Sequence, residues 1–181
     1  MAHWLKNDVD IGIMAINVSG KQIMNEKLTE HVTSALEKYN LPSNRIELEV
    51  TENYIMKQAE QSIQTLEELR DHSVHISIDD FGTGYSSLNY LKKLPINKIK
   101  IDREFIDGIP SDPHDITIID AVIAIAKNLN LKVLAEGVEN SRQLSFLKSA
   151  GCDEYQGYYY SKPLTAEGFE SLLKSKYLVA S

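Results

Sequence analysis

The sequence has little of several features that define common protein classes. One cysteine among 181 residues, Cys152, excludes an internal disulfide and a cysteine-based zinc site, and it reads as a small buried residue. No apolar run reaches the roughly 18 residues of a membrane-spanning helix. The first residues lack the apolar core of a signal peptide. We therefore expect a cytoplasmic segment without membrane contact, which could belong to a larger, membrane-anchored protein.

Positive charge is also scarce. The chain has 19 Lys and Arg residues against 26 Asp and Glu residues, a formal net charge of −7. Binding to duplex DNA needs clustered cations to neutralise phosphates, and the sequence has no basic run. A duplex nucleic acid is therefore not the expected partner, whereas a nucleotide held through metal ions stays open.

The pattern that is present alternates short apolar runs with helical periodicity. We expect strands at 11–16, 45–50, 74–78, 96–101 and 131–135 and near 155, with the first strand buried. Helices are expected at 25–39, 59–70, up to 94, 115–129, 141–149 and 166–175. Six βα units of about 30 residues predict an α/β fold with a mainly parallel sheet. A closed barrel needs about 250 residues, so the sheet is either open or a barrel lacking about two of eight units.

Polar side chains mark the ends of these expected strands: Asn17, Glu49, Asp79, Asp80, Lys100, Glu136 and Gln156. The carboxyl ends of parallel strands meet at one rim, where chemistry is usually placed. Repulsion between carboxylates gathered there is best relieved by hard divalent cations. Adjacent Asp79 and Asp80 suit two neighbouring metals, as in two-metal phosphoesterases. Taken singly, each acid could instead cap a helix, and Lys100 could be a lysine that reaches solvent along its stem.

Six segments together resemble the EAL-domain family of cyclic di-GMP phosphodiesterases, and they follow family order from about residue 4 to about residue 175. They are Ile16-Asn17-Val18-Ser19, Leu48-Glu49-Val50-Thr51-Glu52, Asp79-Asp80-Phe81-Gly82-Thr83-Gly84-Tyr85-Ser86-Ser87-Leu88, Lys98-Ile99-Lys100-Ile101-Asp102, Ala135-Glu136-Gly137-Val138-Glu139 and Gln156-Gly157-Tyr158. The resemblance implies a TIM-like (β/α) barrel with one antiparallel strand. It also implies hydrolysis of cyclic di-GMP to linear pGpG.

The resemblance further implies a role for each site residue, with two divalent cations, Mg²⁺ or Mn²⁺. The first ion would be held by Asn17, Glu49 and Asp79, and the second by Asp79, Asp80 and Glu136. Lys100 would orient the attacking water, and Glu139 and Gln156 would complete the surroundings of the site.

A loop beside the metal acids carries a further implication. Glu52 would fasten the loop made by Phe81, Gly82, Thr83, Gly84, Tyr85, Ser86 and Ser87. In this family that loop links the metal site to a dimer interface, so a homodimer is implied. From the residues alone, Glu52 could accept hydrogen bonds from the loop or merely cap the following helix.

The Glu-Ala-Leu motif that names the family is absent from the 181 residues. In the family layout its Glu, a metal ligand, lies upstream of the Asn17 segment. We therefore expect one EAL-type domain over residues 1–181 that lacks its N-terminal strands and this motif, with impaired turnover. The alternatives are an inactive cyclic di-GMP receptor, a protein-interaction module, or a fragment without a function of its own.

Overall fold

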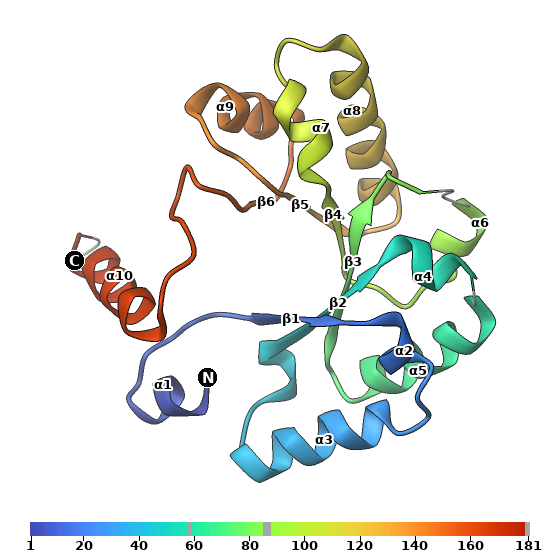
Figure 1. Ribbon diagram of the computed structural model, residues 1–181, viewed down its shortest axis with the longest axis vertical. Coiled ribbons are helices and arrows are strands. Elements are labelled where there is room, and N and C mark those ends of the chain that lie inside the picture. Colours follow the sequence, from blue (N-terminus) through green and yellow to red (C-terminus); the bar gives the residue numbers. More distant parts are fainter. Residues whose placement is uncertain (58, 85–87, 180–181) are drawn as a thin grey trace.

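The computed structural model describes residues 1–57, 59–84 and 88–179. Its centre is one sheet whose strands follow chain order and pair in parallel throughout (Figure 1). The strands are β1 (Met14–Val18), β2 (Ile46–Thr51), β3 (His75–Phe81), β4 (Lys98–Ile101), β5 (Lys132–Ala135) and β6 (Glu154–Tyr155). The predicted α/β fold with six parallel strands is confirmed. None of these strands is the antiparallel one that the family resemblance implies.

Helices surround the sheet and connect its strands (Figure 1). The connections contain α2 (Gly20–Ile23), α3 (Leu28–Tyr39), the 3₁₀ turn η1 (Ser43–Arg45), α4 (Glu52–Lys57), α5 (Ala59–Asp71), α6 (Leu88–Leu91), α7 (Arg103–Gly108), α8 (Pro113–Asn128) and α9 (Ser141–Ala150). The chain opens with α1 (Ala2–Lys6) and closes with α10 (Ala166–Val179). No described helix is both long and apolar enough to cross a membrane.

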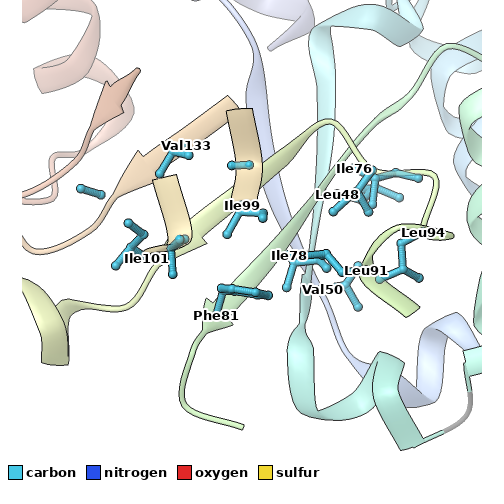
Figure 2. Packing of buried hydrophobic residues seen from close by; sticks show 14 of the residues in the cluster. Leu48, Val50, Ile76, Ile78, Phe81, Leu91, Leu94, Ile99, Ile101 and Val133 are labelled. Atoms are coloured by element: carbon cyan, nitrogen blue, oxygen red, sulfur yellow. The ribbon is translucent and has the colours of Figure 1, made fainter. Parts of the chain in front are cut away.

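The central strands alternate apolar and polar side chains, which places the two kinds on opposite faces of the sheet. One face is aliphatic and packs against the helices; Figure 2 shows part of it: Leu48, Val50, Ile76, Ile78, Ile99 and Ile101, with Leu91 of α6. The other face carries Glu47, Glu49, Ser77, Lys98 and Lys100, all of them buried. Burial of a charged face requires that its charges be paired.

Ion pairs across the charged face show that the sheet curls. The Lys98 ammonium on β4 lies 2.8 Å from a carboxylate oxygen of Glu47 on β2 and 2.7 Å from one of Glu154 on β6. In a flat sheet, strands that are four positions apart are separated by roughly 19 Å. One ammonium can touch both only if the sheet bends around it. The fold is therefore a half-barrel with helices outside, not an open flat sheet.

The two edges of the sheet differ from the sequence prediction. The first strand was expected to be buried at 11–16, but β1 begins at Met14 and the Ile16 side chain is 44% exposed. The prediction of a buried strand is wrong because β1 has a single neighbour, β2. Short helices α2, α4 and α7 were not predicted, since four to six residues show little periodicity. Cys152 is buried, as expected.

Helices α1 and α10 lie side by side (Figure 1). The rings of Trp4 in α1 and Phe169 in α10 are 5.5 Å apart, and the Trp4 indole N–H donates to Glu170 at 3.1 Å. A cavity of about 1120 Å³ adjoins them, lined also by Met14 of β1, Leu134 of β5 and residues after β6. The opening of the half-barrel between β1 and β6 is thus bordered by both terminal helices.

Candidate active site

Three carboxylates from separate elements converge on the ammonium of Lys100. Its Nζ lies 2.8 Å from Glu49 Oε1 on β2, 3.0 Å from Asp79 Oδ1 on β3 and 2.7 Å from Glu136 Oε1 directly after β5. Lys100 itself is 2% exposed. Residues that the sequence separates by up to 87 positions, from Glu49 to Glu136, therefore meet at the carboxyl-end rim, as the strand-end pattern predicted.

The electrostatics of this cluster favour a charged lysine. Burial by itself would lower the pKa of Lys100, but hydrogen bonds with Glu136, Glu49 and Asp79 outweigh it and hold that pKa above its usual value. Burial raises the pKa of Glu136 despite the opposing effect of Lys100, and repulsion from Asp79 and Glu49 acts in the same direction as burial. The cluster carries more negative than positive charge, which suits the binding of further cations.

A β-bulge presents the adjacent acids Asp79 and Asp80. The register between β3 and β4 shifts between Ile78 and Phe81, and Asp80 takes a left-handed conformation with φ +54°. Asp tolerates this conformation better than most residues, and bulges are common beside active sites. The Asp80 N–H donates to Asp79 Oδ1 at 3.1 Å. Burial, with repulsion from Asp79 and contact with Asp102, raises the pKa of Asp80.

The amides Asn17 and Gln156 lie at the two ends of the same rim. Asn17 on β1 is in register with Glu49 on β2 and is exposed. Gln156 follows β6; its N–H donates to the Ala135 carbonyl at 2.8 Å, and its carbonyl accepts from the Val138 N–H at 3.0 Å. These bonds fasten Gln156 to the segment after β5, beside Glu136. The acids therefore lie between two amides on opposite edges of the sheet.

Glu52 reaches the loop that follows Asp79 and Asp80. It is the first residue of α4, is 1% exposed, and its Oε2 accepts from the Gly82 N–H at 3.0 Å. Gly82 has φ +99°, a conformation that other residues resist. The Thr83 hydroxyl donates to the Asp80 carbonyl at 2.8 Å. Gly84 is described, whereas Tyr85, Ser86 and Ser87 lie outside the described residues.

Glu139 contacts a residue that sequence reasoning missed. Its carboxylate accepts from Arg103 at 2.8 Å, and Arg103 also pairs with Asp107 at 3.3 Å along α7. The Glu139 N–H donates to Gln143 Oε1 at 2.8 Å. Both Arg103 and Glu139 have side chains exposed by more than 40%. Arg103 was missed because α7 was not predicted; its position directly after Lys100-Ile101-Asp102 was the available signal.

The donor set at the rim consists of oxygens, which fits Mg²⁺ or Mn²⁺. Within the described part of the chain, no three His, Cys, Asp or Glu side chains form a ready-made metal group. The point on which Glu49, Asp79 and Glu136 converge is taken by the Lys100 ammonium. The acids are therefore gathered by the fold and neutralised in part by the lysine.

Sequence reasoning also missed a second ionic cluster. It lies two residues before Glu49 on β2 and Lys100 on β4, and it includes Glu154 of β6. Lys98 binds Glu47 and Glu154, and Glu154 lies 3.6 Å from Lys132 as well. Burial would lower the pKa of Lys98, but the hydrogen bonds with Glu154 and Glu47 raise it overall. The alternation Lys98-Ile99-Lys100 opposite Glu47-Leu48-Glu49 was the sequence signal for two stacked layers.

Comparisons with known proteins assign the family. The sequence profile of the EAL domain matches residues 1–163, so the chain belongs to the EAL domain family. It is 45% identical over 162 residues to the cyclic di-GMP phosphodiesterase NbdA of Pseudomonas aeruginosa, a match that covers 90% of this chain and 21% of NbdA. The chain spans about a fifth of the length of the curated relatives it matches.

Solved structures agree with this assignment. The PaMucR phosphodiesterase in complex with c-di-GMP matches with a TM-score of 0.89 at 43% identity, covering 93% of this chain and 68% of that chain. Klebsiella pneumoniae BlrP1, in a manganese and cy-diGMP complex, matches with a TM-score of 0.81 at 28% identity, covering 90% and 42% of the two chains. This chain therefore shares its fold with EAL domains, which have a TIM-like barrel.

Proposed function

We propose that this chain is a metal-dependent phosphodiesterase domain that hydrolyses cyclic di-GMP to linear pGpG. The observation that carries the proposal is the convergence of Glu49, Asp79 and Glu136 on buried Lys100 at the carboxyl-end rim of an EAL-family fold. Relatives named as cyclic di-GMP phosphodiesterases, and a related structure that holds cy-diGMP with manganese, support it.

The residues at the rim would hold two divalent cations, Mg²⁺ or Mn²⁺. Asn17, Glu49 and Asp79 supply oxygens for one; Asp79, Asp80 and Glu136 supply oxygens for the other. When bound, such cations lower the pKa of an attacking water and neutralise the charge that builds on the phosphate. The acids need little movement to serve them, because their carboxylates already share one ammonium.

Lys100 would change partners when cations arrive. When its carboxylate partners hold cations, the Lys100 ammonium still has three N–H donors at the centre of the cluster. The raised pKa of Lys100 keeps all three present at neutral pH. An N–H donor fixed there can donate a hydrogen bond to the oxygen of the attacking water and hold that oxygen in line with the phosphorus. Glu139 and Gln156 would contact the substrate or the residues around it.

The loop that starts at Phe81 would couple the site to a partner chain. Its Gly82 is bound to Glu52 and its Thr83 to Asp80, so a displacement of the loop would move the acid pair. We propose that the domain acts as a homodimer in the cytoplasm and that Glu52 holds this loop in place.

The test is turnover of cyclic di-GMP by the full chain with Mn²⁺ or Mg²⁺, followed by product chromatography. We expect linear pGpG to form with either metal and to vanish with EDTA. The exposed variant Lys132→Met serves as the matched control and should keep wild-type turnover. PaMucR assayed alongside tests the separate prediction that this chain is slower. Absence of pGpG under all metal conditions would overturn the proposal.

One observation favours a second candidate, an inactive receptor that binds cyclic di-GMP without turnover. Of the described residues, no three acids form a ready metal group, and Lys100 lies where they converge. Calorimetric titration of the chain with cyclic di-GMP separates the candidates. A receptor binds the nucleotide without pGpG forming, whereas an enzyme converts it in the presence of metal.

A further inference from the structure

The lower ionic cluster lies directly beneath the proposed catalytic one. On β4, Lys98 precedes Lys100 by two residues, and on β2, Glu47 precedes Glu49 by two. Two residues along a strand return to the same face about 6.6 Å further on. The charged face therefore holds two layers, each with one lysine at its centre. Ser77 of β3 lies between them, fully buried and in register with both Glu49 and Lys98.

The two acids that pair with Lys98 differ in how they are supported. Glu47 has a side chain only 4% exposed, and Lys98 is the one ion-pair partner that the described residues offer it. Glu154 is 34% exposed and has Lys132 as a second cation at 3.6 Å. Loss of Lys98 would thus leave Glu154 with water and Lys132. It would leave Glu47 as an uncompensated buried charge, which is strongly unfavourable.

Another buried lysine lies one layer up on the same face of the sheet. Lys100 is carried by the same strand as Lys98, and its ammonium already serves Glu49, the neighbour of Glu47 on β2. A buried carboxylate without a partner would draw that ammonium down, away from Asp79 and Glu136. A lysine has a flexible stem and a point charge, so it can change layers at small cost in strain.

We propose that Lys98 is a positioning residue: by neutralising Glu47 it keeps the Lys100 ammonium in the upper layer with Glu49, Asp79 and Glu136. The inference rests on the proposed function for its catalytic consequence. A merely mechanical role, in which Lys98 ties β2, β4 and β6 together, makes a different prediction. A mechanical tie is lost whenever Lys98 is lost, whereas a charge imbalance disappears when Glu47 loses its charge too.

The experiment compares Lys98→Met, Glu47→Gln and the double variant Lys98→Met/Glu47→Gln with wild type. Lys132→Met is the control for a lysine that touches Glu154 without touching Glu47. Two properties are measured on the full chain: kcat with Mn²⁺, and the ¹H–¹⁵N signal of the Lys100 ammonium, which reports its position whether or not the chain turns over substrate. Thermal melting shows which variants are folded.

We expect Lys98→Met to shift the Lys100 signal and to lower kcat by about 10–100-fold, the usual effect of losing a supporting contact. The double variant should return the signal to its wild-type position and recover kcat to within about threefold of wild type. Glu47→Gln and Lys132→Met should stay near wild type in both measurements.

The proposal is overturned if Lys98→Met leaves the signal and kcat unchanged, or if the folded double variant is as impaired as Lys98→Met. If Lys98→Met does not fold, the double variant still decides: it must fold with a wild-type Lys100 signal. A wild-type chain that makes no pGpG defeats the proposed function, while the ammonium signals still decide whether Lys98 positions Lys100.

Discussion

The two faces of strands β2, β3 and β4 are built from the same segments and are both largely buried, yet they are opposite in chemistry. The face toward the helices is aliphatic, with Leu48, Ile76 and Ile99 at its centre (Figure 2). The face toward the barrel interior carries Glu49, Lys100 and their partners. Strands buried on both faces in parallel sheets usually read as continuous apolar runs. Here the alternation marks the interior face as one that serves a purpose other than core packing.

The energetics of the two faces differ accordingly. Each aliphatic side chain removed from water stabilises the fold by roughly 1.5–3 kcal/mol. A buried ion pair contributes little net stability, because desolvation offsets the attraction between its charges. The apolar face should therefore determine whether the chain folds, and the charged face whether it acts.

Lys100→Met should separate activity from stability most clearly. Loss of the ammonium removes the donor that we propose orients the attacking water, so turnover of cyclic di-GMP should fall by about 10²–10⁴-fold. Three carboxylates lose their counter-charge, and cations bound at the rim can replace it, so the variant should melt near wild type when Mn²⁺ is present. The measurement is kcat beside thermal melting with and without the metal. Wild-type turnover in Lys100→Met would show that Lys100 has no role in the reaction.

Ile99→Ala should show the reverse. Ile99 lies between Lys98 and Lys100 on β4, points to the opposite face and is fully buried. Truncation leaves a cavity and should lower the free energy of unfolding by about 2–5 kcal/mol, while Ile99→Val should lower it by about 0.5–1.5 kcal/mol. Both variants should keep near wild-type kcat under conditions where they are folded. Urea denaturation gives the first quantity, and turnover at low temperature gives the second.

A large loss of kcat in folded Ile99→Val would contradict the division between the faces. It would mean that packing on the outer face sets the position of the neighbouring lysines to within the tolerance of the reaction. The same assay on Ile119→Val, a fully buried residue on α8, is a control that lies off the strand.

Glu52, the first residue of α4, contacts the loop after Asp80. Its substitution should lower turnover less than substitution of Lys100. Its hydrogen bond to the Gly82 N–H is charge-assisted and partly buried, and charge-assisted bonds contribute about 1.5–3 kcal/mol. We expect Glu52→Ala to lower turnover by about tenfold and to increase amide exchange at Gly82, with folding intact. Glu52→Gln keeps an acceptor oxygen and should lie between the two. Unchanged turnover in Glu52→Ala would mean that Glu52 does not hold the loop in an active position and only begins α4.

The sequence predicted which strand-end side chains meet better than it predicted the edges of the fold. The strand-end positions of Glu49, Asp79, Lys100 and Glu136 follow from alternation and from the geometry of parallel sheets, and these residues do meet. The bulge at Asp80 did not follow, because it depends on a left-handed backbone that no periodicity reports. The exposure of β1 depends on which strands flank it. The ion pairs of Lys98 could not be predicted, because they form only when β2 and β6 curl toward β4.

Cys152 offers the last and smallest test, because its titratable thiol is buried and donates to the backbone carbonyls of Val133 and Glu154. Burial raises the pKa of its thiol to about 11, whereas hydrogen bonds with carboxylates raise the pKa of buried Lys98 and keep it charged. With an ordinary pKa of 9.0 in the unfolded chain, the thiol contributes stability that is complete below pH 9 and is lost as the pH rises through 11. Relative to Cys152→Ala, wild type should lose about 2 kcal/mol of unfolding free energy between pH 8 and pH 11. Urea titrations of both proteins at each pH measure this difference, and subtracting the variant cancels every other titrating group. A constant difference would mean that water or a cation reaches the thiol, and that this part of the core is less apolar than the aliphatic face of β4.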